Sequence, residues 1–105
     1  MKKVVSILFM CLFLASVSLA DLGDNPKLGQ NYPNPAKEKT YVEVEFSSPR
    51  AQLVLSNILG ETIQVLNLPH SGTYVIDVTE IPEGLYFYTL EADGHKSTKK
   101  LTVKK

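Results

Sequence analysis

The most restrictive feature of the sequence is a pair of β-rich runs near its end, separated by only Asp93 and Gly94. Both central residues of a two-residue type I′ turn need positive φ, which Gly and Asp tolerate. The two runs are therefore predicted to form an antiparallel hairpin with a fixed register. From the turn outward, the predicted pairs are Ala92 with His95, Glu91 with Lys96, Leu90 with Ser97, Tyr88 with Lys99, Tyr86 with Leu101 and Gly84 with Val103.

This register places the large apolar residues of both strands on one face of the hairpin. The predicted set is Tyr86, Tyr88, Leu90, Leu101 and Val103. A slip of one residue would turn the whole set to solvent, because successive side chains of a strand point to opposite faces. The face that packs on the core is thus a definite prediction.

The first twenty residues have the pattern of a secretory signal peptide. Lys2 and Lys3 precede an apolar run over residues 4–14, and the small residues Ser18 and Ala20 fit a cleavage site after residue 20. A transmembrane anchor, the alternative, needs about 20 apolar residues, and this run is shorter. A lipid anchor does not fit, because the single cysteine, Cys11, lies inside the apolar run. We therefore predict a cleaved signal peptide and no integral membrane anchor.

Removing these 20 residues from the 105 leaves 85, which is enough for one small domain without a disulfide. The charge is distributed unevenly: residues 95–105 hold five lysines and no acid, whereas residues 21–94 hold four basic and eleven acidic residues. Such asymmetry often marks an interaction tail. Lysines also protect the exposed edge of a sheet from strand addition, so both interpretations stay open.

Four further runs alternate between apolar and polar residues as half-buried strands do. They cover residues 40–46, 51–56, 61–67 and 73–78, with turn residues between them. Short strands at a spacing of about ten residues favour an antiparallel β-sandwich, here of six to seven strands. The predicted inward residues are Val42, Val44, Phe46, Leu53, Leu55, Ile63, Val65, Tyr74, Ile76 and Val78.

Two proline-containing segments complete the predicted domain. Residues 21–27 are expected to be a flexible leader, and residues 28–35 an edge segment held by Tyr32, because two prolines remove donors that a central strand needs. The run from Pro82 to Tyr86 looks like a tyrosine corner, in which a tyrosine hydroxyl bonds backbone a few residues upstream. This corner favours an immunoglobulin-like sandwich spanning residues 28–105.

The sequence contains no arrangement of residues that predicts catalysis. His70 and His95 lie in predicted turns without a metal-ligand spacing, and no thiol remains after processing. Motifs for a serine nucleophile, a zinc protease or a phosphate loop are absent from the sequence. Tyr86 and Tyr88 are expected to face the core, which leaves no stacking platform for nucleic acid. We expect no enzyme, no cofactor or metal site, and no nucleic-acid partner.

Three blocks of the sequence, taken together, resemble the C-terminal (type A) sorting domain of the type IX secretion system of Bacteroidetes. They lie in the same order and at the same end of the chain as in that family and cover about residues 28–105. The blocks are Gln30-Asn31-Tyr32-Pro33-Asn34-Pro35, Ser56-Asn57-Ile58-Leu59-Gly60-Glu61-Thr62-Ile63, and Ile81-Pro82-Glu83-Gly84-Leu85-Tyr86-Phe87-Tyr88 with Lys99-Lys100-Leu101-Thr102-Val103-Lys104-Lys105.

The resemblance implies a non-enzymatic domain that is recognised in the periplasm, routed across the outer membrane, and secreted or attached at the cell surface. The implied partners are the translocon, a surface processing enzyme and anionic lipopolysaccharide. The implied recognition residues are Gly84, Tyr86, Lys99, Lys100, Leu101, Val103, Lys104 and Lys105, which the predicted register gathers into one surface patch. The implied structural residues are Tyr32, Pro33, Asn34, Pro35, Leu59, Gly60 and Pro82. The alternative is a small secreted adhesion or carbohydrate-binding module of the same fold.

The chain departs from this family at two points. A Phe usually follows the second proline of the first block, whereas this chain has Ala36, which predicts weaker packing at that edge. A large cargo usually precedes the domain, whereas only residues 21–27 separate it here from the predicted signal peptide. The domain itself is therefore expected to be the exported product, unless the gene is a remnant or short variant.

Overall fold

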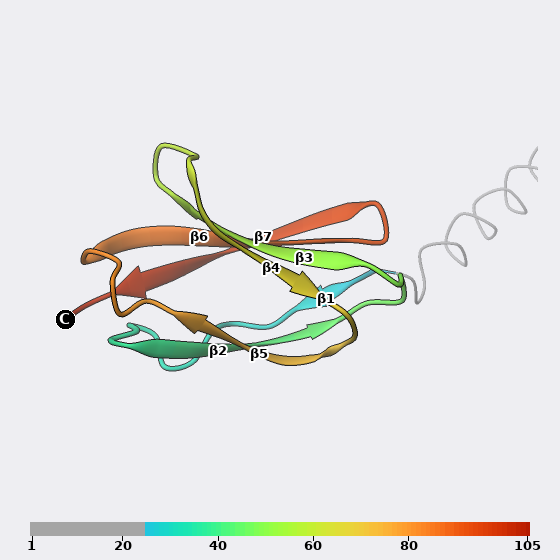
Figure 1. Cartoon of the computed structure of the whole chain (residues 1–105), viewed down its shortest axis with the longest axis horizontal. Helices are drawn as coiled ribbons and strands as arrows, with labels where there is room; N and C mark the ends of the chain where they lie inside the picture. Colours follow the sequence, from blue (N-terminus) through green and yellow to red (C-terminus); the bar gives the residue numbers. More distant parts are fainter. Residues whose placement is uncertain (1–24) are drawn as a thin grey trace, which may run out of the picture.

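The computed structural model describes residues 25–105, which form seven strands in two sheets (Figure 1). The strands are β1 (Lys27–Leu28), β2 (Lys39–Glu45), β3 (Ala51–Asn57), β4 (Thr62–Leu68), β5 (Gly72–Asp77), β6 (Gly84–Ala92) and β7 (His95–Val103). Neighbouring strands are all antiparallel, and the sheet orders are β1-β2-β5 and β4-β3-β6-β7. The predicted signal peptide (1–20) and residues 21–24 of the predicted leader lie outside the described residues.

The predicted all-β class is confirmed for the part of the chain that the structure describes. Residues 25–105 contain no helix, and thus none that is long and apolar enough to cross a membrane. The two sheets form the two layers seen in Figure 1, and side chains of both contribute to one apolar core. Fully buried members include Val42 and Ile76 from one sheet and Leu53, Tyr88 and Leu101 from the other.

The register of the last hairpin is confirmed at every predicted pair, from Ala92 with His95 to Gly84 with Val103. Both turn residues adopt the positive φ that the type I′ turn requires, 54° at Asp93 and 74° at Gly94. The predicted apolar face is buried, with at most 7% of any of its five side chains exposed. The two-residue turn therefore determines which residues reach the core.

The predicted burial of Ile63 and Val65 is wrong, because these side chains are 41% and 50% exposed. The chain pairs Leu53 with Leu66, and residues directly opposite each other in an antiparallel pair share a face. An irregularity between Leu55 and Ser56 accommodates one extra residue in β4, which reverses the faces relative to the turn. The inward apolar residues of β4 are consequently Leu66 and Leu68.

The first strand begins earlier than the sequence indicated. Lys27, the last residue of the predicted leader, pairs with Glu45 in β2, and its Nζ lies 3.9 Å from the Glu45 carboxylate. Both side chains are at least 72% exposed, so this ion pair contributes little to stability. The other predicted inward residues agree with the structure, although Phe46 and Tyr74 are only half-buried against the core.

The Asp93 carboxylate connects the turn of the last hairpin to the turn between β2 and β3. It accepts hydrogen bonds from the backbone N–H groups of Ser47 (3.0 Å) and Ser48 (2.5 Å). The bond from Ser47 is the main reason that the pKa of Asp93 lies below its ordinary value of 3.8. The ionised form of Asp93 thus favours the folded state.

We expect this carboxylate to make the stability of the domain pH-dependent under acid conditions. A carboxyl with a lowered pKa in the folded state stabilises the fold above its unfolded-state pKa, and this contribution disappears as the pH falls through the folded-state pKa. Asp93→Asn should therefore flatten the pH dependence of the urea midpoint at acid pH. The control is Glu43→Gln, whose exposed carboxylate has no hydrogen-bond partner among residues 25–105. An unchanged acid profile in Asp93→Asn would contradict the assignment.

Candidate functional site

The predicted recognition residues lie where β7 ends beside the start of β6. The register brings Gly84 next to Val103 and Tyr86 next to Leu101, as predicted. Their side chains do not form one surface patch, however, because Tyr86, Leu101 and Val103 are at most 7% exposed. These residues occupy the inward face of the hairpin, so their alternation along the strands removes them from the surface.

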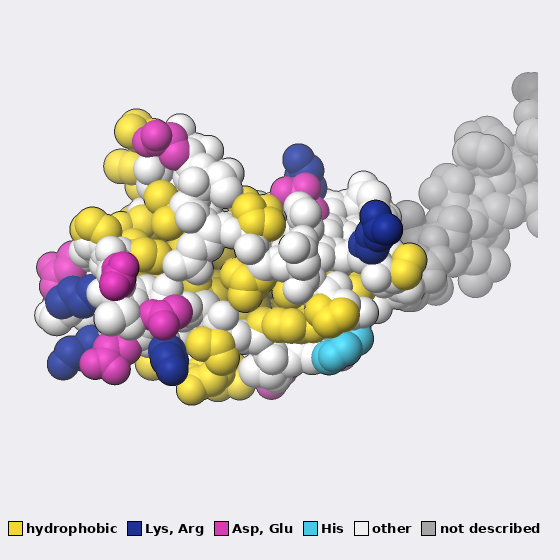
Figure 2. All heavy atoms as spheres, viewed as in Figure 1, with side chains coloured by type: hydrophobic (Ala, Val, Ile, Leu, Met, Phe, Trp, Pro, Cys, Tyr) yellow, Lys and Arg dark blue, Asp and Glu magenta, His cyan; other side chains and the backbone are white. Residues whose placement is uncertain are grey.

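The exposed members of the predicted set are Gly84, Lys100, Lys104 and Lys105, whereas Lys99 is half-buried on the inward face. We call Gly84, Lys100 and Lys104 the strand-end patch. It lies at the end of the molecule marked C in Figure 1, where Figure 2 shows basic and acidic side chains mixed together. A binding partner of the folded domain would therefore contact the lysine side chains and the exposed backbone of this patch, and it would not reach the buried Tyr86, Leu101 and Val103.

The tyrosine corner is present as predicted. The Tyr86 hydroxyl donates a 2.7 Å hydrogen bond to the carbonyl of Pro82, which satisfies a phenol group that is otherwise almost fully buried. Gly84 adopts φ +154°, a conformation that residues with side chains rarely take, and a Cβ there would lie 3.8 Å from the Tyr86 ring. The corner thus fixes the path by which the chain enters β6.

The outer edge of β7 is covered by the segment of residues 30–36, which contains the first family block. The N–H of Ala36 donates to the carbonyl of Thr102 (2.7 Å), and the N–H of Lys104 donates to the carbonyl of Ala36 (2.9 Å). The side chain of Asn34 accepts a hydrogen bond from the N–H of Thr102 (3.2 Å). Two sequence blocks that lie far apart in the chain therefore build one site.

Ala36 is fully buried in the core below this contact. Together with Val103 it forms a parallel β-bridge, so the backbone of residue 36 holds the strand end in place. The two peptide bonds Tyr32–Pro33 and Asn34–Pro35 are cis. Both prolines are exposed, which fits a segment that forms an edge.

Asn31 holds the segment in the interior, whereas Tyr32, which was predicted to pin it, attaches it only at the surface, through two backbone hydrogen bonds to Tyr41. Tyr32 is 50% exposed, and its ring lies 5.8 Å from the ring of Tyr41 on the surface. Asn31 is only 2% exposed, and its side-chain amide donates to Thr40 Oγ1 (3.0 Å). Hydropathy offered no signal for this asparagine, because a polar residue beside prolines looks like part of an exposed turn.

Asn31 and Tyr88 connect the segment to the core through backbone groups. The Tyr88 hydroxyl accepts a hydrogen bond from the N–H of Asn31 (2.8 Å) and donates one to the carbonyl of Gly29 (2.9 Å). Burial raises the pKa of Tyr88, which keeps the hydroxyl protonated and able to donate. Each buried side-chain polar atom among residues 25–105 has a hydrogen-bond partner. The interior of the site is therefore rigidly specified.

Lys105 is held at the corner between β5 and β6. Its Nζ donates to the backbone carbonyls of Lys37 (2.9 Å), Val78 (2.7 Å) and Thr79 (3.0 Å). Its N–H donates to the carboxylate of Glu83 (2.6 Å), a residue that sequence reasoning did not assign to the site. Lys105 therefore positions the end of the strand, because its charge is already engaged by the domain.

The second family block forms the turn between β3 and β4. Gly60 has φ +84°, as a tight turn of this kind requires, and Asn57 Oδ1 accepts hydrogen bonds from the N–H groups of Leu59 and Glu61 (both 3.0 Å). Leu59 is 79% exposed, so it does not pack against the domain. This block lies apart from the strand-end patch, and its exposed apolar residues have no role in the fold.

The fold is a small β domain of two antiparallel sheets in which an N-terminal segment covers the end of the last strand. Residues 30–104 match the family described as the secretion system C-terminal sorting domain. The chain belongs to this family and carries a C-terminal sorting signal for type IX secretion. A comparison with curated proteins finds no significant match.

This membership confirms the resemblance seen in the sequence, and it does not favour the alternative of an adhesion or carbohydrate-binding module. A sorting-signal domain targets proteins and is not a catalytic unit. It implies interaction with the type IX secretion machinery and export through the outer membrane to the cell surface or the medium. The matched region begins at the segment that covers β7 and ends at Lys104 in the strand-end patch.

Proposed function

We propose that the type IX machinery recognises the folded domain at the strand-end patch, and that the buried members of the predicted set act by shaping it. The observation that carries this proposal is the closure of the β7 edge by residues 30–36. Once that edge is covered, Lys100 and Lys104 are the exposed lysines of the predicted set whose side-chain ammonium groups make no hydrogen bond within residues 25–105, and Gly84 is exposed near them. Two exposed lysines close to the end of the last strand would attract an acidic receptor surface.

An immunoglobulin-like type of sandwich agrees with the strand order. The seven strands correspond in chain order to A, B, C, C′, E, F and G, which gives sheets A-B-E and C′-C-F-G. The tyrosine corner then lies at the E–F corner, its usual position in that fold. This arrangement places the strand-end patch on strand G and the corner that precedes strand F.

The remaining steps of the proposed route rest on the sequence. The N-terminal signal peptide would bring the chain to the periplasm, and the type IX translocon would then carry it across the outer membrane. A surface processing enzyme and attachment to anionic lipopolysaccharide would follow, as in the family. The lysines at the end of β7 would also suit an anionic surface, because exposed cations attract phosphate-bearing groups.

The test of the proposed function is a double charge reversal in the strand-end patch, Lys100→Glu with Lys104→Glu. We expect the amount of protein at the cell surface and in the medium to fall about tenfold or more, which corresponds to about 1.4 kcal/mol of recognition free energy. Localisation of the tagged protein in cells with and without an intact type IX translocon measures the effect. The matched control is Lys96→Glu, an exposed lysine on the same strand near the opposite end.

Urea denaturation of the double variant separates a loss of recognition from a loss of folding. Both lysines of the double variant are exposed, so its urea midpoint should stay close to that of the wild type. Normal export of a stably folded double variant would contradict recognition at this patch. Equal export from cells that lack the translocon would contradict the proposed route as a whole.

A further inference from the structure

The turn between β3 and β4 carries apolar side chains that are largely exposed to solvent. Ile58 and Leu59 are 68% and 79% exposed, and Ile63 and Val65 on β4 are 41% and 50% exposed. Figure 1 shows this hairpin projecting beyond the two sheets, and Figure 2 shows apolar side chains at its tip beside an acidic one. Exposed clusters of this kind on a small soluble domain mark interaction surfaces.

The edge formed by β4 also lacks the protection that the other edge of its sheet has. β4 is the outermost strand, and its seven residues include no charged residue and no proline. The opposite edge, β7, is covered by residues 30–36 at its C-terminal end and carries lysines along its length. An uncharged, uncovered edge strand is a template for pairing with another strand.

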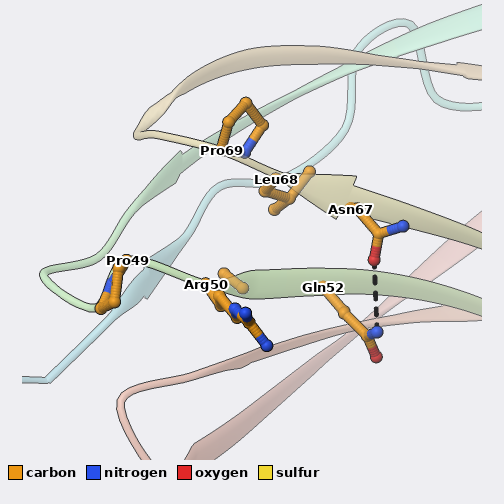
Figure 3. Close-up of a pocket in the computed structure, with 7 residues that line it drawn as sticks. Pro49, Arg50, Gln52, Asn67, Leu68 and Pro69 are labelled. Carbon is orange, nitrogen blue, oxygen red and sulfur yellow. Dashed lines mark hydrogen bonds between the residues drawn. The ribbon is translucent and has the colours of Figure 1, made fainter.

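A pocket lies at the other end of the same hairpin (Figure 3). Its volume is about 550 Å³, and its lining combines apolar groups of Pro49, Leu68 and Pro69 with the guanidinium group of Arg50. Gln52 and Asn67 form one wall, joined by a 3.3 Å hydrogen bond. The pocket therefore offers an apolar floor with one positive charge beside it.

These three features are self-complementary. If β4 pairs antiparallel with β4 of a second copy about a two-fold axis near Val65, Thr62 of each copy lies opposite Leu68 of the other. Since a strand of seven residues spans about 20 Å, this pairing carries the tip of each hairpin to the pocket end of the other. We propose that the exported protein forms a two-fold dimer in which the Ile58 and Leu59 tip of each copy fills the pocket of the other.

Charge complementarity supports a second copy as the occupant. Glu61 adjoins the apolar tip, and Arg50 lines the pocket, so the dimer brings these opposite charges together twice. The strands that pair carry no charge, so no like charges meet across the axis. A lipid surface fits the tip less well, because Glu61 would be carried toward anionic headgroups.

Sedimentation equilibrium of the purified protein without its predicted signal peptide, at about 100 μM, tests the proposal, since this concentration detects micromolar association. We expect the wild type to have a mass close to that of a dimer and Leu59→Asp to have a clearly lower mass, because its dissociation constant is raised about a hundredfold or more. The matched control is Val75→Asp on β5, which replaces a residue that is 41% exposed on the other sheet and should leave the dimer intact. A monomeric wild type, or a dimeric Leu59→Asp, overturns the proposal.

Cysteine cross-linking tests the same contact without relying on the Asp variant. The protein without its predicted signal peptide lacks Cys11, the single native cysteine, so Leu59→Cys mixed with Pro69→Cys should give a disulfide-linked heterodimer under mild oxidation. Leu59→Cys alone should not cross-link, because the two tips lie at opposite ends of the paired strands. Self-cross-linking of Leu59→Cys, or vesicle binding by a monomer, would assign the tip to a different contact. Both assays use purified protein and do not require export through the translocon, so a negative result in either assay leaves the proposed function standing.

Discussion

Leu101→Ala is expected to destabilise the domain by about 2–5 kcal/mol and thereby to abolish export. The Leu101 side chain is fully buried and packs beside Tyr86 on the inward face of the last hairpin. A domain of about 80 residues has a total stability near the low end of about 5–15 kcal/mol, so this loss is a large fraction of it. The export defect would then come from unfolding of the signal.

Urea denaturation of Leu101→Ala, combined with localisation in cells, measures both effects. Lys96→Ala is the control, because it shortens an exposed side chain on the same strand without opening a cavity. If Leu101→Ala proves as stable as the wild type and yet stays inside the cell, the machinery reads the leucine side chain directly. That outcome would contradict the placement of the recognition surface on the exposed lysines.

Tyr88→Phe is expected to cost about 1–3 kcal/mol although it removes a single oxygen atom. The Tyr88 hydroxyl accepts a hydrogen bond from the N–H of Asn31 and donates one to the carbonyl of Gly29. A Phe side chain can form neither bond, so both backbone groups would lose their partner. Detachment of residues 29–33 from the core would also loosen the cover over β7. We therefore expect export to fall together with stability.

Chemical denaturation and amide hydrogen exchange of the backbone around Asn31 measure this effect. The matched control is Tyr74→Phe, which removes a hydroxyl whose bond to the carbonyl of His70 is exposed to water. Water can replace that bond, so the control should lose much less stability. Equal losses of stability in the two variants would show that the buried hydrogen bonds of Tyr88 contribute no more to stability than the exposed one of Tyr74.

The last hairpin could be predicted pair by pair because a two-residue turn leaves no freedom in the register. The Asp93 and Gly94 turn fixed the pairing, and the apolar residues of both strands then agreed on one buried face. The tyrosine corner could also be predicted from the sequence, because Pro82, Gly84 and Tyr86 stand at the spacing that this motif needs. Local chemistry was sufficient for both features.

The features that the sequence did not reveal depend on contacts between distant residues. β4 contains apolar residues on both faces, so its pattern left open which face reaches the core, and an extra residue in the pairing decided it. The role of Asn31 required knowing that Tyr88 and Thr40 come to meet it from different sheets. The candidate recognition residues were implied by family likeness, and their division into buried and exposed members follows from the structure.

If the export machinery recognises the strand-end patch as proposed, the cover over β7 makes export depend on the complete folding of the domain. Asn34 bonds Thr102 across a separation of 68 residues, so the strand end acquires its final shape only after nearly the whole domain has been synthesised and folded. Contacts between such distant residues form late, because closing a long loop costs entropy before the contacts compensate for it. A truncated or misfolded chain would lack the finished surface, and the export apparatus would thereby discriminate against it.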